Sequence, residues 1–188
     1  PNIRFYTGAA QSNDAALSAL IGLAPPLLAG TSQQVSVRVS NIGNNALTAV
    51  ALNYQLNQGP VVSQSFTTQI ASGANDVLTF SVPAQIPSGQ NFQLRAWLSG
   101  INGGGPDPNA ANDSVVSTIC TALPAGTITV GATGDFPSLQ AVFNQLSCGG
   151  IGGQVTVQIN ENQTGSFSLS AIPGIANGGV VLTSLNQS

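Results

Sequence analysis

A strict alternation of apolar and polar residues within residues 33–56 limits what this chain can fold into. Apolar side chains occupy every second position from Val35 to Val39, and the alternation resumes from Val50 to Leu56 after an Asn/Gly-rich break. A period of two places the apolar side chains on one face of a β-strand. The segment therefore predicts two strands, each with one buried face, joined by an Asn/Gly turn.

Further segments of the same kind surround this pair. Strands are predicted at residues 14–22, 61–70, 78–82, 91–99 and 114–119, with Leu78, Phe80 and Val82 facing inward in the third of these. The first is expected at a sheet edge, because Pro25 and Pro26 follow it. Seven short strands with turns at regular intervals indicate an all-β immunoglobulin-like sandwich over residues 13–119. Residues 1–12 are expected to be a linker or the end of a preceding domain.

The pattern changes in residues 120–188. A helix is predicted within residues 134–150, because Leu139, Val142, Phe143 and Leu146 form one apolar stripe at helical spacing. Asp135 is its expected N-cap, and two glycines end it. Alternating apolar residues then predict a short strand at residues 154–160, followed by further short strands between turns.

Several motifs resemble a known family. VSVRVSNIG at 35–43, LNYQLNQG at 52–59, QLRAWLS at 93–99 and DPNAANDS at 107–114 are similar to immunoglobulin-like, CARDB-type adhesion modules. The helix, with the short strands and Asn/Gly corners after it, resembles the opening of a pectin-lyase-like right-handed parallel β-helix. This resemblance implies a helix-capped β-helix segment after the sandwich, in a large secreted or surface protein of Bacteroidetes-like bacteria.

The chain has two cysteines, Cys120 and Cys148. In an extracellular chain they are most simply a disulfide, and the alternative is two buried free thiols. The resemblance favours the disulfide, because a cysteine at the end of the helix matches the usual position in the family. Such a bond would tie the last strand of the sandwich to the capping helix.

Charged residues make up only 5% of the chain, with three Arg, no Lys, no His and six acidic residues. So few cations argue against nucleic acid as a partner and against a basic membrane patch. No apolar run is long enough to cross a bilayer. Without His or Lys, and without a pair of carboxylates in the C-terminal segment, no group is placed to transfer protons, so no catalytic activity is expected. Low charge also favours contacts between copies of the chain.

One loop contains oxygen-bearing side chains of the kind that bind Ca²⁺. These are Asp107, Asn109, Asn112 and Asp113. The alternative is that Asn and Asp side chains simply hold a tight turn, with no cofactor at all.

Arg95 and Trp97 are the candidate binding residues. Both are predicted on the outer face of their strand, because the residues between and beside them alternate inward. A Trp with a neighbouring Arg suits stacking on a sugar ring or on a partner chain. The alternative is a Trp that covers the sheet, with Arg over its ring.

Three residues fall in short glycosylation-type motifs. Ser114 follows Asp113 in a Bacteroidetes-like O-glycosylation signal, and Asn112 and Asn162 begin N-glycosylation-type sequons.

The sequence therefore predicts a non-catalytic structural or adhesive module at the outside of a bacterial cell. Its partners are expected to be proteins, including copies of itself assembled end to end into a fibre. The alternative is a carbohydrate-binding accessory module of a polysaccharide-active β-helix enzyme.

Overall fold

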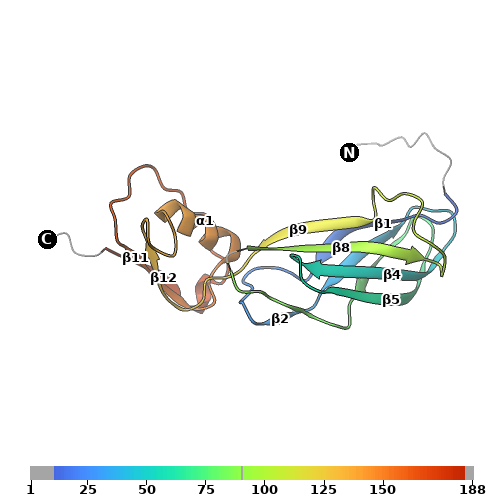
Figure 1. The fold of residues 1–188 in the computed structure, drawn as a ribbon, viewed down its shortest axis with the longest axis horizontal. Coiled ribbons are helices and arrows are strands. Elements are labelled where there is room, and N and C mark those ends of the chain that lie inside the picture. Colours follow the sequence, from blue (N-terminus) through green and yellow to red (C-terminus); the bar gives the residue numbers. More distant parts are fainter. Residues whose placement is uncertain (1–10, 90, 185–188) are drawn as a thin grey trace. The chain divides into compact units, whose positions relative to one another are not determined.

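The computed structural model describes residues 11–89 and 91–184, so most of the expected linker at residues 1–12 lies outside the described part. The chain divides into two compact units. Unit 1 contains residues 11–22, Gln34–Val82 and Leu94–Ser117; unit 2 contains Leu23–Gln33, Pro83–Gln93 and residues 118–184. β-strands are the main regular secondary structure of both units, and the one α-helix of the described residues belongs to unit 2 (Figure 1). The prediction of a mostly β chain is confirmed.

Two sheets form the sandwich of unit 1. One has the order β1-β3-β6, from Ala15–Ile21, Ser36–Asn41 and Asn75–Thr79. The other has the order β5-β4-β8-β9, from Val61–Ile70, Leu47–Leu56, Asn91–Ile101 and Ser114–Cys120. β1 and β6 run antiparallel to β3, and β5 and β8 run antiparallel to β4. These are the seven predicted strands, and β1 lies at the edge of its sheet as expected.

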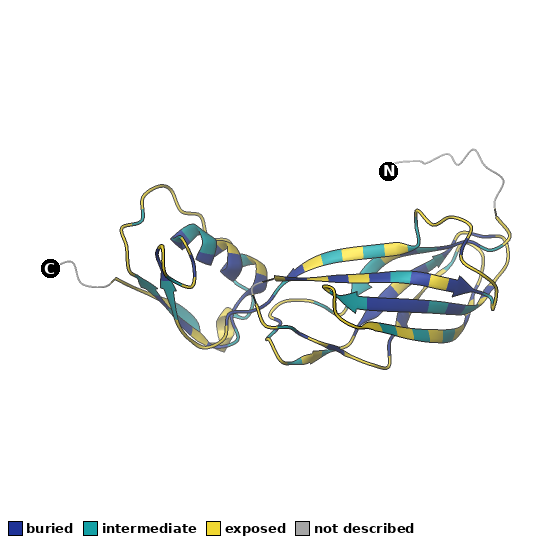
Figure 2. Cartoon of the chain, viewed as in Figure 1, coloured by how far each residue is buried: buried dark blue, intermediate teal, exposed yellow. Residues whose placement is uncertain are grey.

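The alternation in the sequence becomes the alternation of burial along these strands. In β8, Leu94, Ala96 and Leu98 are buried while Arg95 is exposed (Figure 2). The inward direction predicted for Val82 is wrong, since its side chain is 51% exposed. β6 ends at Thr79, so the segment that carries Val82 has already left the sheet and no longer follows its period.

The first two predicted strands do not pair with each other. β3 and β4 belong to different sheets, so the turn between them carries the chain across the sandwich. The fully buried Asn41 holds this crossing. Its Nδ2 donates to the carbonyls of Asn45 at 2.8 Å and Ile70 at 2.7 Å, and its Oδ1 accepts from the Gly43 N–H at 3.0 Å. One amide side chain thus satisfies several buried backbone groups at the corner.

An aromatic cluster packs in the core of unit 1. The ring of Phe80 lies edge-on to Tyr54, with centroids 4.8 Å apart, and edge-on to Phe66 at 5.5 Å. Phe80 follows the β1-β3-β6 sheet, while the other two rings come from the second sheet. Edge-to-face pairs of this kind stabilise beyond the area they bury.

Unit 2 contains a parallel sheet with the order β10-β11-β12, from Gly126–Val130, Gln154–Ile159 and Gly179–Ser184. A second parallel contact joins Leu123 to Ile151, and the Ile151 N–H donates to the Pro173 carbonyl at 3.0 Å. Three successive segments of the chain therefore lie side by side at two places. At one place they are β10, β11 and β12, and at the other they are the segments that contain Leu123, Ile151 and Pro173. A 3-10 turn, η1 (Ile175–Asn177), precedes β12, and the short strands β2 (Ser32–Gln33) and β7 (Ala84–Gln85) pair separately.

Helix α1 (Leu139–Gly149) connects β10 to β11 and buries the predicted apolar stripe. Its N-cap is Ser138, whose Oγ accepts from the Ala141 N–H at 3.2 Å, so the prediction of Asp135 as N-cap is wrong. Asp135 instead accepts from the N–H and the hydroxyl of Thr129, at 2.8 and 2.9 Å. These bonds lower the pKa of Asp135 and close the turn before the helix.

Candidate functional site

The predicted calcium loop is held against β1 by its own polar groups. Asp107 is only 5% exposed, and its two carboxylate oxygens accept from the backbone N–H groups of Ala15 at 2.5 Å and Asn109 at 2.8 Å. Asn112 donates from Nδ2 to Asp14 Oδ1 at 3.2 Å, and its carbonyl accepts from the Leu17 N–H at 2.9 Å. The loop is thus attached to β1 at several points.

Three carboxylates gather here, those of Asp14, Asp107 and Asp113. Burial, together with the negative charges of Asp107 and Asp14, raises the pKa of Asp113 to about 6. Burial also raises the pKa of Asp14, an effect that its hydrogen bond with Asn112 opposes. The buried Oδ1 atoms of Asn112 and Asp113 receive no hydrogen bond. The cluster therefore has more hydrogen-bond acceptors than donors, and its carboxylates repel one another.

As a metal site, this arrangement is incomplete among the described residues. No group of three His, Cys, Asp or Glu side chains there is placed to hold a metal ion. Asp107 already accepts two backbone N–H groups, and Asn109 is exposed, with its N–H serving the turn. The two unpartnered oxygens are those of Asn112 and Asp113. Calcium binding by Asp107, Asn109, Asn112 and Asp113 stays a prediction.

Arg95 and Trp97 lie together on β8. The guanidinium carbon of Arg95 is 5.0 Å from the centroid of the half-buried Trp97 ring, which is cation–π distance. Across the ladder, Trp97 is opposite Asn53, whose Oδ1 accepts from the Ser63 hydroxyl at 2.6 Å. Because Arg95 lies over the ring, a sugar that stacked on that face would have to displace it.

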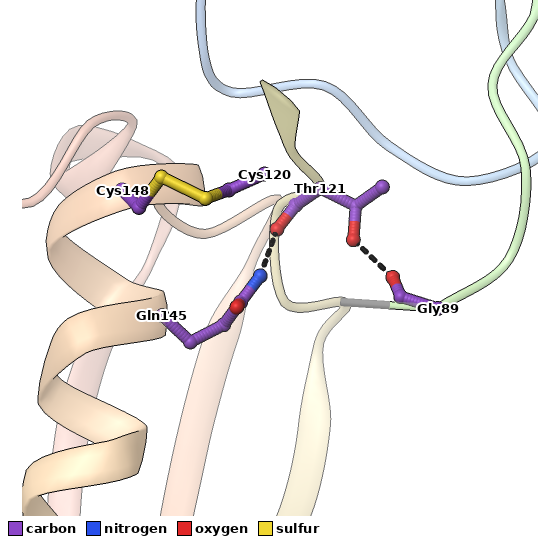
Figure 3. Close-up of a disulfide and its surroundings, with 5 residues drawn as sticks. All are labelled: Gly89, Cys120, Thr121, Gln145 and Cys148. Carbon is purple, nitrogen blue, oxygen red and sulfur yellow. Dashed lines mark hydrogen bonds between the residues drawn. A yellow bond between two sulfur atoms is a disulfide. The ribbon is translucent and has the colours of Figure 1, made fainter. Parts of the chain in front are cut away.

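The disulfide between Cys120 and Cys148 is present, as predicted, and lies within unit 2 (Figure 3). Its Cα atoms are 5.7 Å apart, within the usual range. Beside it, Gln145 Nε2 donates to the Thr121 carbonyl at 2.7 Å, and the Thr121 hydroxyl donates to the Gly89 carbonyl. A Cβ at Gly149 would lie 2.0 Å from the Thr121 carbonyl oxygen, so only glycine fits there. The bond therefore joins two segments that already pack closely.

The candidate glycosylation residues differ in accessibility. Ser114 is exposed at the first residue of β9, and Asn162 is exposed between β11 and β12. Asn112 is half-buried, and the amide nitrogen that would carry a glycan donates to Asp14. Glycosylation at these three residues stays a prediction.

One feature that sequence reasoning missed is the contribution of Asp14 to the carboxylate cluster. Asp14 immediately precedes β1, whereas the other two carboxylates lie on the loop after β8. The only local signal was an acidic residue directly before a strand, which is also typical of an ordinary turn.

The end of the parallel sheet is an edge of the kind that the expected end-to-end contact requires. Among the described residues, β12 pairs on one side only, with β11, and its Val181 and Leu182 side chains are exposed. A hollow of about 540 Å³ lies beside it, lined by residues that include Ile159, Glu161 and Phe167. Sequence reasoning missed the hollow, which has no sequence motif of its own.

The fold defines a class: a two-unit, mostly β chain with an antiparallel sandwich, a parallel sheet and a disulfide between Cys120 and helix α1. No known protein family matches this chain, and no curated protein is significantly similar in sequence. Among solved structures, it is similar to the CARDB domain of the PF1109 protein from Pyrococcus furiosus in complex with di-metal ions. That similarity has 14% identity and a TM-score of 0.46, and it covers 65% of this chain and 100% of that domain.

Two further structures are similar. A solution structure of the same CARDB domain has 14% identity and a TM-score of 0.45, covering 59% of this chain and 96% of that one. A Paenibacillus sp. cycloisomaltooligosaccharide glucanotransferase complexed with cycloisomaltoheptaose has 13% identity and a TM-score of 0.38, and this chain spans 20% of its length. At such identities and TM-scores, we transfer neither residues nor activities to this chain.

Within the described residues, no helix has the length and apolar character needed to traverse a bilayer.

Proposed function

We propose that this chain is a non-catalytic structural or adhesive module of a secreted or cell-surface bacterial protein. It binds other proteins, including copies of itself, through the free edge of the parallel sheet in unit 2. The observation that carries the proposal is the uncovered side of β12.

The exposure of residues paired across the parallel sheet shows that β12 lacks a neighbouring strand on its outer side. Ile128, Val157 and Leu182 are paired neighbours across β10, β11 and β12, so they point to the same side of the sheet. Val157, with a strand on each side, is 0% exposed, whereas Leu182, with a strand on one side, is 52% exposed. A further strand in the same register would cover Leu182 as Leu182 covers Val157. Unpaired edges with exposed aliphatic side chains favour strand addition.

The composition supports contact between chains. With 5% charged residues, little electrostatic repulsion opposes the approach of two such surfaces. The disulfide supports an oxidising, extracellular location, where such bonds persist.

We also infer that the parallel sheet is the start of a β-helix. Successive segments pair in parallel at two places, in the sheet of β10, β11 and β12 and between Leu123 and Ile151. The coils of a solenoid stack on one another in the same way.

The acidic side chains support a non-catalytic role. Asp76, Asp107, Asp135 and Glu161 each accept hydrogen bonds from backbone N–H groups, as residues that hold turns do. The chain has no His to share a proton with them.

Self-association through β12 is tested with Leu182→Lys. The average molar mass of the wild-type protein, measured by light scattering, is expected to increase with protein concentration. The variant is expected to associate at least about tenfold more weakly, because it places a desolvated charge at the contact. Val116→Lys is the matched control, since Val116 is similarly exposed at 49% but lies on β9. A wild-type protein that stays monomeric at every concentration, or a Leu182→Lys variant that associates as wild type does, would contradict the proposal.

A second candidate function is a carbohydrate-binding accessory module of a polysaccharide-active β-helix enzyme. The cation–π pair of Arg95 and Trp97 on the outer face of β8 favours it. Trp97→Ala is then expected to reduce retention on a polysaccharide affinity gel by about tenfold, because aromatic anchors dominate such contacts. Equal retention of wild type and variant would discard this candidate.

A further inference from the structure

A hollow of about 540 Å³ opens in unit 2 where the parallel strands end. Its apolar part comes from Leu139, the first residue of α1, Ile159, the last residue of β11, and Phe167. Its polar part comes from the segment after β11, which includes Asn160, Glu161 and Gln163. The volume falls in the range of about 300–1,000 Å³ that is typical of small-molecule sites.

Hydrogen bonds fix the polar wall of this hollow. Gln163 Oε1 accepts from the Leu139 N–H at 2.9 Å, and Glu161 Oε1 accepts from the Ala132 N–H at 3.0 Å. The Asn160 N–H donates to the Val130 carbonyl at 2.9 Å, and its side chain is exposed. A wall fixed in advance loses little conformational freedom when a ligand binds.

The aromatic wall is fixed as well. The Phe167 ring lies edge-on to Phe143, with centroids 6.4 Å apart and an interplanar angle of 84°. Phe167 remains 38% exposed. An aromatic ring that is held by a second ring and still reaches solvent offers an apolar surface to a ligand.

The charges around the hollow restrict the ligand. Residues 118–188 contain no Arg and no Lys. Among the described residues that line the hollow, Glu161 alone is charged. An anionic ligand would meet a carboxylate without a compensating cation. A purely apolar ligand would displace water from this polar wall without replacing the hydrogen bonds of that water. A neutral ligand with hydroxyl groups and one apolar face avoids both costs.

We propose that this hollow binds a neutral saccharide, with a sugar ring stacked on Phe167 and its hydroxyl groups hydrogen-bonded to Asn160 and Glu161. The site is distinct from the Arg95–Trp97 pair and goes beyond the proposed contact of β12 with other chains.

The test is a titration of the ¹⁵N-labelled full chain with cellohexaose, maltohexaose and xylohexaose, followed by NMR. Hexagalacturonic acid and chitosan hexamer serve as anionic and cationic comparators. At least one neutral hexamer is expected to bind with a Kd of about 1 mM or tighter and to shift the amide resonances of residues 159–167. The proposal is overturned if none of the neutral hexamers shifts them at about 10 mM, or if only a charged oligomer binds.

Variants separate the site from the rest of the unit. Phe167→Ala is expected to weaken binding at least about tenfold, and Leu169→Ala, a matched loss of an exposed apolar side chain on the same segment, is expected to bind as wild type does. Glu161→Gln is expected to keep affinity within about threefold, because the amide oxygen still accepts hydrogen bonds. If Phe167→Ala does not fold, Asn160→Ala replaces it, with a loss of about fivefold expected.

Binding that Phe167→Ala and Asn160→Ala leave unchanged, or that Glu161→Gln abolishes, would overturn the assignment of a neutral saccharide. Because Leu182 does not line the hollow, Leu182→Lys is expected to keep saccharide binding while losing self-association. The two proposals can therefore fail independently.

Discussion

Replacing both cysteines with serine is expected to lower the free energy of unfolding of unit 2 by about 3 to 4 kcal/mol. Cys120 and Cys148 are 28 residues apart in sequence, and closing a loop of this length restricts the unfolded chain substantially. The contacts beside the bond, from Gln145 and Gly149 to Thr121, are too few to replace that restriction. The expected result is a unit 2 that unfolds at much lower urea concentration.

Two probes make this experiment specific to unit 2. Amide hydrogen exchange in α1 reports on unit 2, whereas the fluorescence of Trp97, the single tryptophan, reports on unit 1. Exchange in α1 is expected to accelerate strongly in the double variant, and in the wild type after reduction, while the Trp97 transition moves much less. Unchanged exchange in α1 would show that the disulfide contributes little to unit 2.

The second large effect is a dependence of the stability of unit 1 on pH. In the folded chain the pKa of Asp113 is raised to about 6, above the ordinary value of 3.8 expected in the unfolded chain. Between these values the folded state binds a proton that the unfolded state has lost, so stability increases as pH falls and decreases as pH rises through about 6. The full shift corresponds to about 3 kcal/mol, and solvent screening of this partly exposed group reduces the expected change to about 1 to 2 kcal/mol.

Urea unfolding followed by Trp97 fluorescence at several pH values measures this change. Asp113→Asn is expected to stabilise unit 1 by about 1 to 2 kcal/mol at neutral pH, because it removes the cost of burying the charge and the repulsion from Asp107 and Asp14. It is also expected to flatten the dependence on pH. Asp76→Asn is the control, since Asp76 is an exposed carboxylate on β6 outside the cluster. An Asp113→Asn variant that is less stable than wild type at neutral pH would show that the carboxylate makes a favourable contact there.

The period-two alternation predicted the seven strands of the sandwich and most of their inward faces, because burial of one face imposes that period wherever a strand occurs; it failed at Val82, which lies beyond the end of β6. It did not predict which strands pair. The turn after β3 resembles a hairpin, yet β4 pairs in the other sheet, since the crossing depends on Asn41 reaching the distant Ile70 carbonyl. Such a contact leaves no local pattern in the sequence.

The same limit applies to the helix cap and to the sites. Asp135 and Ser138 are both residues that favour N-caps, and only the bond between Asp135 and Thr129 decides between them. The carboxylate cluster joins Asp14 to a loop more than 90 residues later, as the Ala15–Asp107 bond shows. The hollow beside β12 arises from segments whose composition is ordinary.

Binding of another chain at the free edge of β12 can be measured by hydrogen exchange at increasing protein concentration. In a strand paired on one side, alternate N–H groups point outward and exchange readily. Strand addition at β12 is expected to protect the unprotected amides of Gly179–Ser184 as the protein associates, while exchange in β4, which has a partner strand on each side, stays constant. Association without protection in β12, or exchange in β12 that is the same at every concentration, would contradict it.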